Sequence, residues 1–319
     1  MSVALPHMLV AVEVETTEGT DVIDGSPSAF LNVSSCEVTP VRGRIANPNV
    51  KGVHSPGAHK TFPSHCTVSI TVPMDGATAG DAPSYSPLLR AAGLVETISS
   101  STSATYTPGT VGHKTATVYK YILQDDGKYR LYISTGVRFN LSLDAQNSAA
   151  PMLTFEGMGK YVAPATTTIS GPSLPDEYGE AKKFLCSDGM TFEVGGASFG
   201  IEGFDLSTNW TINEIRTLTG SSQLDAVYLT RGEDSHIGGG LNFVYSADFE
   251  SVLTKHGADT EFEIEAAWSD GTDTITFTAP KVQFDQWARS GTNYSVPYMC
   301  NGDFGSSEVG NNDFTLVYT

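Results

Sequence analysis

Residues 116–144 read ATVYKYILQDDGKYRLYISTGVRFNLSLD, and residues 262–289 read FEIEAAWSDGTDTITFTAPKVQFDQWAR. In both stretches apolar and polar residues alternate with a period of two, which indicates strands with one buried face. An Asp-Gly pair divides each stretch and predicts a hairpin turn, because glycine tolerates positive φ. Gly127 and Gly271 are 144 residues apart, and Phe139 and Phe284 are 145 apart. This spacing predicts that one β-rich unit occurs twice in the chain.

The same order of elements is expected in both halves: strand, long loop, strand, short helix, hairpin with Asp-Gly, strand, strand. Residues 66–72 alternate as a half-buried strand. Ser86-Pro87 then predicts a short helix with Ser86 as its N-cap, which Gly93 ends. A second helix is expected from Ser246 to Gly257.

The fold class predicted from these patterns is mainly β, with two tandem β-sandwich or barrel domains that each carry one short flanking α-helix. Residues 166–188 are rich in Pro, Thr and Ser and lack periodicity, which is typical of a linker. We therefore expect a first domain at 1–165, a linker at 166–188 and a second domain at 189–319.

Charge and cysteine usage restrict the function. The chain has 36 acidic and 18 basic residues and a formal net charge of −18, the wrong sign for a protein that grips phosphates. The first residues lack the pattern of a signal peptide or a membrane span. The four cysteines are widely spaced, which favours reduced core thiols over a disulfide framework or a zinc site.

Three possible chemical sites have a simpler interpretation. His54, His59, His65 and Cys66 could form a zinc set, but Cys66 begins an alternating strand and is expected to face the core. Residues 196–200 match the G-x-S-x-G pattern of hydrolases, although a strand follows them where that motif needs a helix. Asp125 with Asp126, and Asp270 with Asp273, resemble the paired carboxylates of a glycosidase or a set of calcium ligands, yet turn chemistry explains them. No catalytic, cofactor or metal residue is predicted.

Several longer phrases carry a family resemblance. They are VEVETTEGTD (12–21), LNVSSCEVTPVRG (31–43), APSYSPLLRAAGLVETISSSTSATYTPG (82–109), LTFEGMGKYVAP (153–164), GGASFGIEGFDLSTNW (195–210) and TFTAPKVQF (276–284). The chain resembles the major tail tube proteins of long-tailed, siphovirus-type bacteriophages. The resemblance spans most of the chain and contains no catalytic motif.

The resemblance implies a non-enzymatic virion protein that polymerises into stacked rings and forms the conduit for DNA ejection. A duplicated unit implies a trimeric, pseudo-hexameric ring, with a hexamer as the other possibility. The implied partners are other copies of the chain and the tape measure, tail tip and tail terminator proteins. Viral DNA would pass through the lumen without specific binding, and no cofactor or membrane is implied. Assembly is expected in the host bacterial cytoplasm.

In such relatives a long loop of the first half reaches the next ring, and residues 44–62 match it. The residues expected to form this inter-ring assembly loop are Ile45, Pro48, Val50, Val53, Pro56 and Phe62. The alternative that remains is a virion surface protein, a β-sandwich that binds a receptor or carbohydrate.

Overall fold

The computed structural model describes most of the 319 residues. The described residues are 8–23, 27–45, 60–109, 112–126, 128–146, 149–167, 190–215, 224, 226–230, 236–244, 254, 261–285, 288–290, 293–301 and 313–319.

The predicted mainly β fold is confirmed. The elements before residue 168 are β1 (Met8–Val14), β2 (Ser35–Ile45), β3 (Lys60–Pro73), α1 (Ser86–Ala91), β4 (Leu94–Ser99), β5 (Ser103–Pro108), β6 (Ala116–Leu123), β7 (Tyr129–Gln146), β8 (Met152–Tyr161) and β9 (Ala165–Thr167). Those after residue 189 are β10 (Thr191–Val194), β11 (Ala197–Ser198), β12 (Ile201–Ser207), β13 (Thr211–Ile215), β14 (Ala226–Thr230), β15 (Gly238–Val244), β16 (Phe262–Ser269), β17 (Thr274–Phe284), β18 (Ala288–Ser290), β19 (Asn293–Cys300) and β20 (Thr315–Tyr318).

Two sets of strands share one topology. In the first unit the antiparallel order is β1-β6-β7-β8-β3-β2. In the second unit it is β10-β16-β17-β19-β15-β12, which has the same succession along the chain. The identical order supports the internal duplication that the sequence predicted.

The register of the two units matches in detail. In the first unit the β6–β7 register shifts just after the pair Ala116 and Val137, and in the second the β16–β17 register shifts just after the pair Phe262 and Val282. Val137 and Val282 are 145 positions apart (282 minus 137), which is also the offset between Phe139 and Phe284. A backbone hydrogen bond from a later residue also reaches the edge strand of each unit, β1 in the first and β10 in the second. Leu31 N donates to Val10 O over 2.8 Å, and Phe199 N to Phe192 O over 2.9 Å.

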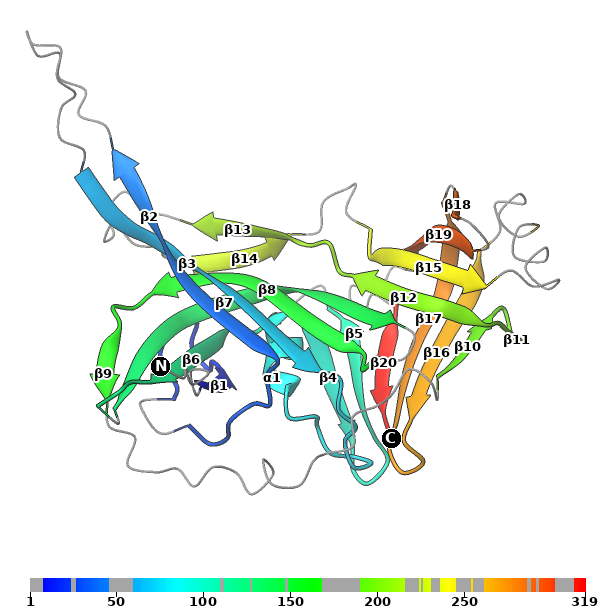
Figure 1. The fold of residues 1–319 in the computed structure, drawn as a ribbon, viewed down its shortest axis with the longest axis horizontal. Coiled ribbons are helices and arrows are strands. Elements are labelled where there is room, and N and C mark those ends of the chain that lie inside the picture. Colours follow the sequence, from blue (N-terminus) through cyan, green and yellow to red (C-terminus); the bar gives the residue numbers. More distant parts are fainter. Residues whose placement is uncertain are drawn as a thin grey trace, which may run out of the picture.

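The long strand β7 links the two units (Figure 1). Along one edge it pairs first with β6 and then, through residues 142–146, with β12 of the second unit. A second link runs through β20, which lies between β17 and β5. Strands of both halves thus belong to one hydrogen-bonded sheet system, and the boundaries 1–165, 166–188 and 189–319 stay a prediction.

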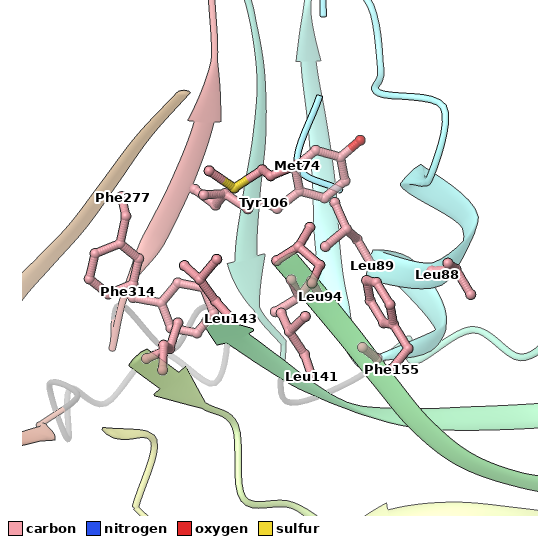
Figure 2. Close-up of a cluster of buried hydrophobic side chains, with 14 of the residues drawn as sticks. Met74, Leu88, Leu89, Leu94, Tyr106, Leu141, Leu143, Phe155, Phe277 and Phe314 are labelled. Carbon is pink, nitrogen blue, oxygen red and sulfur yellow. The ribbon is translucent and has the colours of Figure 1, made fainter. Parts of the chain in front are cut away.

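One hydrophobic core continues through both units. Phe204 lies at its centre in the second unit, with ring centroids 5.3 Å from Phe277 and 6.0 Å from Trp268. Figure 2 shows the part where the units meet, with Leu143 of β7 beside Phe314 of the second half. All these side chains are at most 3% exposed. Burial of this apolar surface, at about 25 cal/mol per Å², is the main stabilising contribution to the fold.

The first predicted helix is present, but its N-cap prediction was wrong. The N-cap is Tyr85, and Ser86 is already helical. The Ser86 hydroxyl donates to Glu96 Oε1 over 2.5 Å, so it does not cap the helix. Gly93, at φ +81°, follows the helix as expected. The second predicted helix lies outside the described residues except for Thr254, which is helical.

Candidate assembly surfaces

The pairing of β7 with β12 is the first joint between the two units. Its register places Phe204 opposite Ala145, Leu206 opposite Leu143 and Ser207 opposite Ser142. The apolar residues of these pairs point into the core, and the two serines point outward. The pairing therefore connects the two units both through backbone hydrogen bonds and through a shared hydrophobic core.

Thr208 closes the first joint. Its N–H donates to Leu141 O over 3.0 Å, and its hydroxyl accepts the Leu141 N–H over 3.1 Å. The same hydroxyl donates to Asn140 Oδ1, which also accepts the Trp210 N–H over 3.2 Å. Trp210 stacks on His113 with the ring planes 6° apart. Because Thr208 is fully buried, each of these polar groups depends on its partners at the joint.

The second joint is the insertion of β20 between β5 and β17. Tyr318 pairs with Ala104 on β5 and with Ile275 on β17. Its hydroxyl lies 3.0 Å from that of Tyr85, which donates to Asp75 O over 3.1 Å. The last strand of the chain is thereby bound to both halves.

The tyrosines of the second joint stay protonated. Burial raises the pKa of Tyr318 and of Tyr85 far above the ordinary value, because a buried phenolate loses its hydration. Tyr106, which donates to Glu96 Oε1 over 2.7 Å, also has a raised pKa, chiefly through burial. These hydroxyls serve as hydrogen-bond partners at neutral pH.

A two-stranded arm, β13 and β14, lies over β7 and β8 of the first unit (Figure 1). Arg138 Nε donates to Val227 O over 2.6 Å, and the Arg138 guanidinium lies 3.5 Å from Glu18. At the outer end, His65 Nδ1 lies 3.4 Å from Glu214 Oε2. The arm of the second unit therefore covers a face of the first.

In the first unit, the outer ends of β2 and β3 correspond to this arm, because β2 and β3 are the equivalents of β12 and β15, and they project beyond the body of the molecule (Figure 1). Of the six residues predicted for the inter-ring loop, Ile45 ends β2, and Phe62 lies in β3 opposite Gly43. Pro48, Val50, Val53 and Pro56 lie outside the described residues.

One face of the molecule is acidic and rich in threonine. It is the outward face of the sheet β10-β16-β17-β20-β5-β4, which is the far side from the core. Glu193 and Glu265 are cross-strand partners on it, and Glu263 is exposed beside them. Of its six strands, β10, β16, β20, β5 and β4 contain no Lys or Arg, and β17 contains one, Lys281. Paired like charges destabilise an isolated subunit and create a strong negative potential.

The structure gives the chemical motifs structural roles. Cys66 is buried, and burial raises the pKa of its thiol to about 11, which disfavours a metal-binding thiolate. Cys36 and Cys300 are also buried free thiols, as predicted, while Cys186 lies outside the described residues. His54 and His59 of the possible zinc set lie there as well. Within the described part of the chain, no group of three or more metal-ligating side chains occurs.

The glycine and aspartate motifs are turns. Gly195 and Gly196, both at positive φ, connect β10 to β11 in a hairpin, so Ser198 lies on a strand. Asp126 Oδ1 accepts the Lys128 N–H, and Asp270 Oδ1 accepts two N–H groups within its own turn. The turn interpretation is confirmed. In the described ranges no helix is long and apolar enough to cross a membrane.

The duplicated β units and their edge-to-edge joints agree with a comparison against family models. The model described as "Phage tail tube protein" matches residues 8–300. The chain belongs to this family. No curated protein matches it. The tail tube protein is a structural component of the phage tail, as its sequence resemblance implied.

Sequence reasoning missed the surfaces that join the units of this tail tube protein. The arm β13–β14 and the strand β20 were not predicted, and the surfaces that hold them, β7 and β8 for the arm and β5 for β20, lie far away along the chain. A weak signal existed for β20, since residues 314–318 alternate apolar and less apolar side chains at the end of the sequence.

Proposed function

We propose that the protein polymerises into stacked rings that form the phage tail tube, through which viral DNA passes during ejection. The observation that carries the proposal is the β7–β12 joint, at which one unit adds a strand edge to an equivalent unit. A joint between two copies of one fold can be repeated between chains, and repetition around an axis closes a ring. Two units per chain favour a trimeric, pseudo-hexameric ring, and a hexamer is the other arrangement.

The charge of the described strands is the basis for proposing which face lines the conduit. DNA must slide through a tail tube, so a wall that binds phosphate would retain it, whereas a wall of like charge repels it. The acidic, threonine-rich face of β10-β16-β17-β20-β5-β4 has this character. We assign this face to the lumen. A cryo-EM map of assembled tubes that places Glu193 and Glu265 on the outer surface would contradict the assignment.

Stacking of the rings is assigned to the predicted inter-ring loop, residues 44–62, at the end of the β2–β3 hairpin. Deletion of Val50 to His59 removes much of this loop and leaves the paired parts of both strands intact. We expect the deletion variant to fold with the wild-type circular dichroism spectrum and to form no tubes. Tubes of normal length from this variant would refute the assignment.

The direct test of the proposed function is electron microscopy of the concentrated recombinant protein, with light scattering to measure its mass in dilute solution. Hollow tubes or rings are expected, and their symmetry distinguishes three chains from six. The tape measure, tail tip and tail terminator proteins are the proposed partners in the virion, with assembly in the host cytoplasm. Monomers that persist at high concentration, also with a purified tail tip added, would refute self-association.

A further inference from the structure

The edge of β2 that faces away from β3 is equivalent to an edge that is already paired inside the molecule. Cys36 and Val38 of β2 are buried as their equivalents Phe204 and Leu206 of β12 are, each 168 positions later. β12 pairs with β15 on one edge and with β7 on the other. In the part of the chain that the structure describes, β2 pairs only with β3.

The backbone of β2 is arranged to accept a second strand. Pro40 lies within β2, and a proline is compatible with a ladder only where its nitrogen faces away from the paired strand. Residues of the same parity, Cys36 and Val38, therefore direct their N–H and C=O groups to the open edge. Lys120 Nζ donates to the Cys36 carbonyl. A carbonyl has two lone pairs, so it can accept a further N–H.

The second unit presents the surface that would receive β2. In the first unit, the last third of β7, which runs along β8, holds β12 of the second unit. In the second unit, β18 continues β17 along β19 in the same way: Ala288 pairs with Ser295, as Ser142 pairs with Thr154. In the described residues β18 has β19 as its only strand partner. Its other edge corresponds to the edge of β7 that holds β12.

We propose that β2 of one chain pairs antiparallel with β18 of a second copy, in the register of the internal β12–β7 joint. Thr39 then lies opposite Ala288 of the second copy, as Ser207 lies opposite Ser142 within the chain. The projecting β2–β3 hairpin lies over β17 and β19 of that copy, as the β13–β14 arm lies over β7 and β8. Internal and intermolecular joints alternate around the ring. This inference deepens the proposed self-association and rests on it.

Disulfide trapping tests the register. Thr39 and Ala288 are both exposed, and as equivalents of Ser207 and Ser142 they form a pair without direct hydrogen bonds. Such pairs have Cα atoms about 4.5 Å apart, within the range of a disulfide. The variant Thr39→Cys with Ala288→Cys is made in a Cys186→Ser background, assembled, oxidised and analysed on a non-reducing gel. We expect disulfide-linked oligomers, the largest of which contains as many chains as one ring.

Matched controls separate the possible outcomes. Ser142→Cys with Ser207→Cys lies at the internal joint and should form a disulfide within one chain. Each single variant at Thr39 or Ala288 should remain uncrosslinked. If rings or tubes form and the double variant gives no product, the β2–β18 joint is wrong while the proposed function stands. If the wild-type protein forms no assembly and the variant gives no product, both are wrong.

Discussion

Removal of the Thr208 hydroxyl tests how much the first joint contributes to the stability of the chain. Thr208→Val keeps the shape of the side chain and removes the oxygen that accepts the Leu141 N–H. That N–H is directed to the β12 side of β7 and would lose its partner in a fully buried position. An unsatisfied buried donor costs about 1–3 kcal/mol, and the lost bond to Asn140 adds about 1 kcal/mol. We expect the free energy of unfolding to fall by about 2–4 kcal/mol.

Urea unfolding followed by circular dichroism and tryptophan fluorescence measures this change. Thr208→Ser is the matched control, because it keeps the hydroxyl and loses only a methyl group, at a cost of about 1 kcal/mol. Thr208→Val should have a lower urea midpoint than Thr208→Ser, with an unchanged slope. Equal midpoints for the two variants would show that the buried hydrogen bonds of the joint do not stabilise the fold.

The other predictions concern a glycine, the thiols and a tyrosine. Gly93→Ala should lower the thermal midpoint far more than Gly112→Ala: both have positive φ, but only a Cβ at Gly93 would meet a tryptophan ring, at 1.8 Å. Equal losses would show that the ring moves aside. Cys36 and Cys66 should resist iodoacetamide at pH 8 and react fully in urea, because burial raises their pKa values to about 12 and about 11. Alkylation of either thiol in the folded protein would contradict this. Because the pKa of Tyr318 is raised in the folded protein, its contribution to the free energy of unfolding is complete below pH 10 and is lost as the pH rises further. Tyr318→Phe should therefore make the free energy of unfolding fall less steeply above pH 10. An unchanged dependence on pH would exclude the contribution of Tyr318.

Local patterns were sufficient to predict the strands that pair with near neighbours. The alternation on both sides of Gly127 and Gly271 predicted the β6–β7 and β16–β17 hairpins and their equivalence. Both hairpins are short-range structures in which turn chemistry and the burial of one face act together. Their strands could therefore be predicted from a few residues.

The elements that join the units could not be predicted from local patterns. β4 and β5, residues 94–108, are polar and rich in serine and threonine, so the hydrophobic signal is weak. β5 gains its second partner from β20, more than 200 positions later. Ser86 shows the same limit on a smaller scale, because Glu96 takes the hydroxyl that local rules assign to an N-cap. In each case a distant residue determines the outcome.

The duplication also changes the energetics of assembly. In the proposed ring of three chains, six units meet at six joints, and three of these are the internal β7–β12 joint. An internal joint forms without the loss of translational and rotational freedom that an intermolecular joint costs, an estimated 4–15 kcal/mol. Only the three joints between chains then depend on protein concentration. A hexamer of single-unit chains has six such joints, so a duplicated chain should close its ring at lower concentration, with each intermolecular joint carried by the open edge of β2.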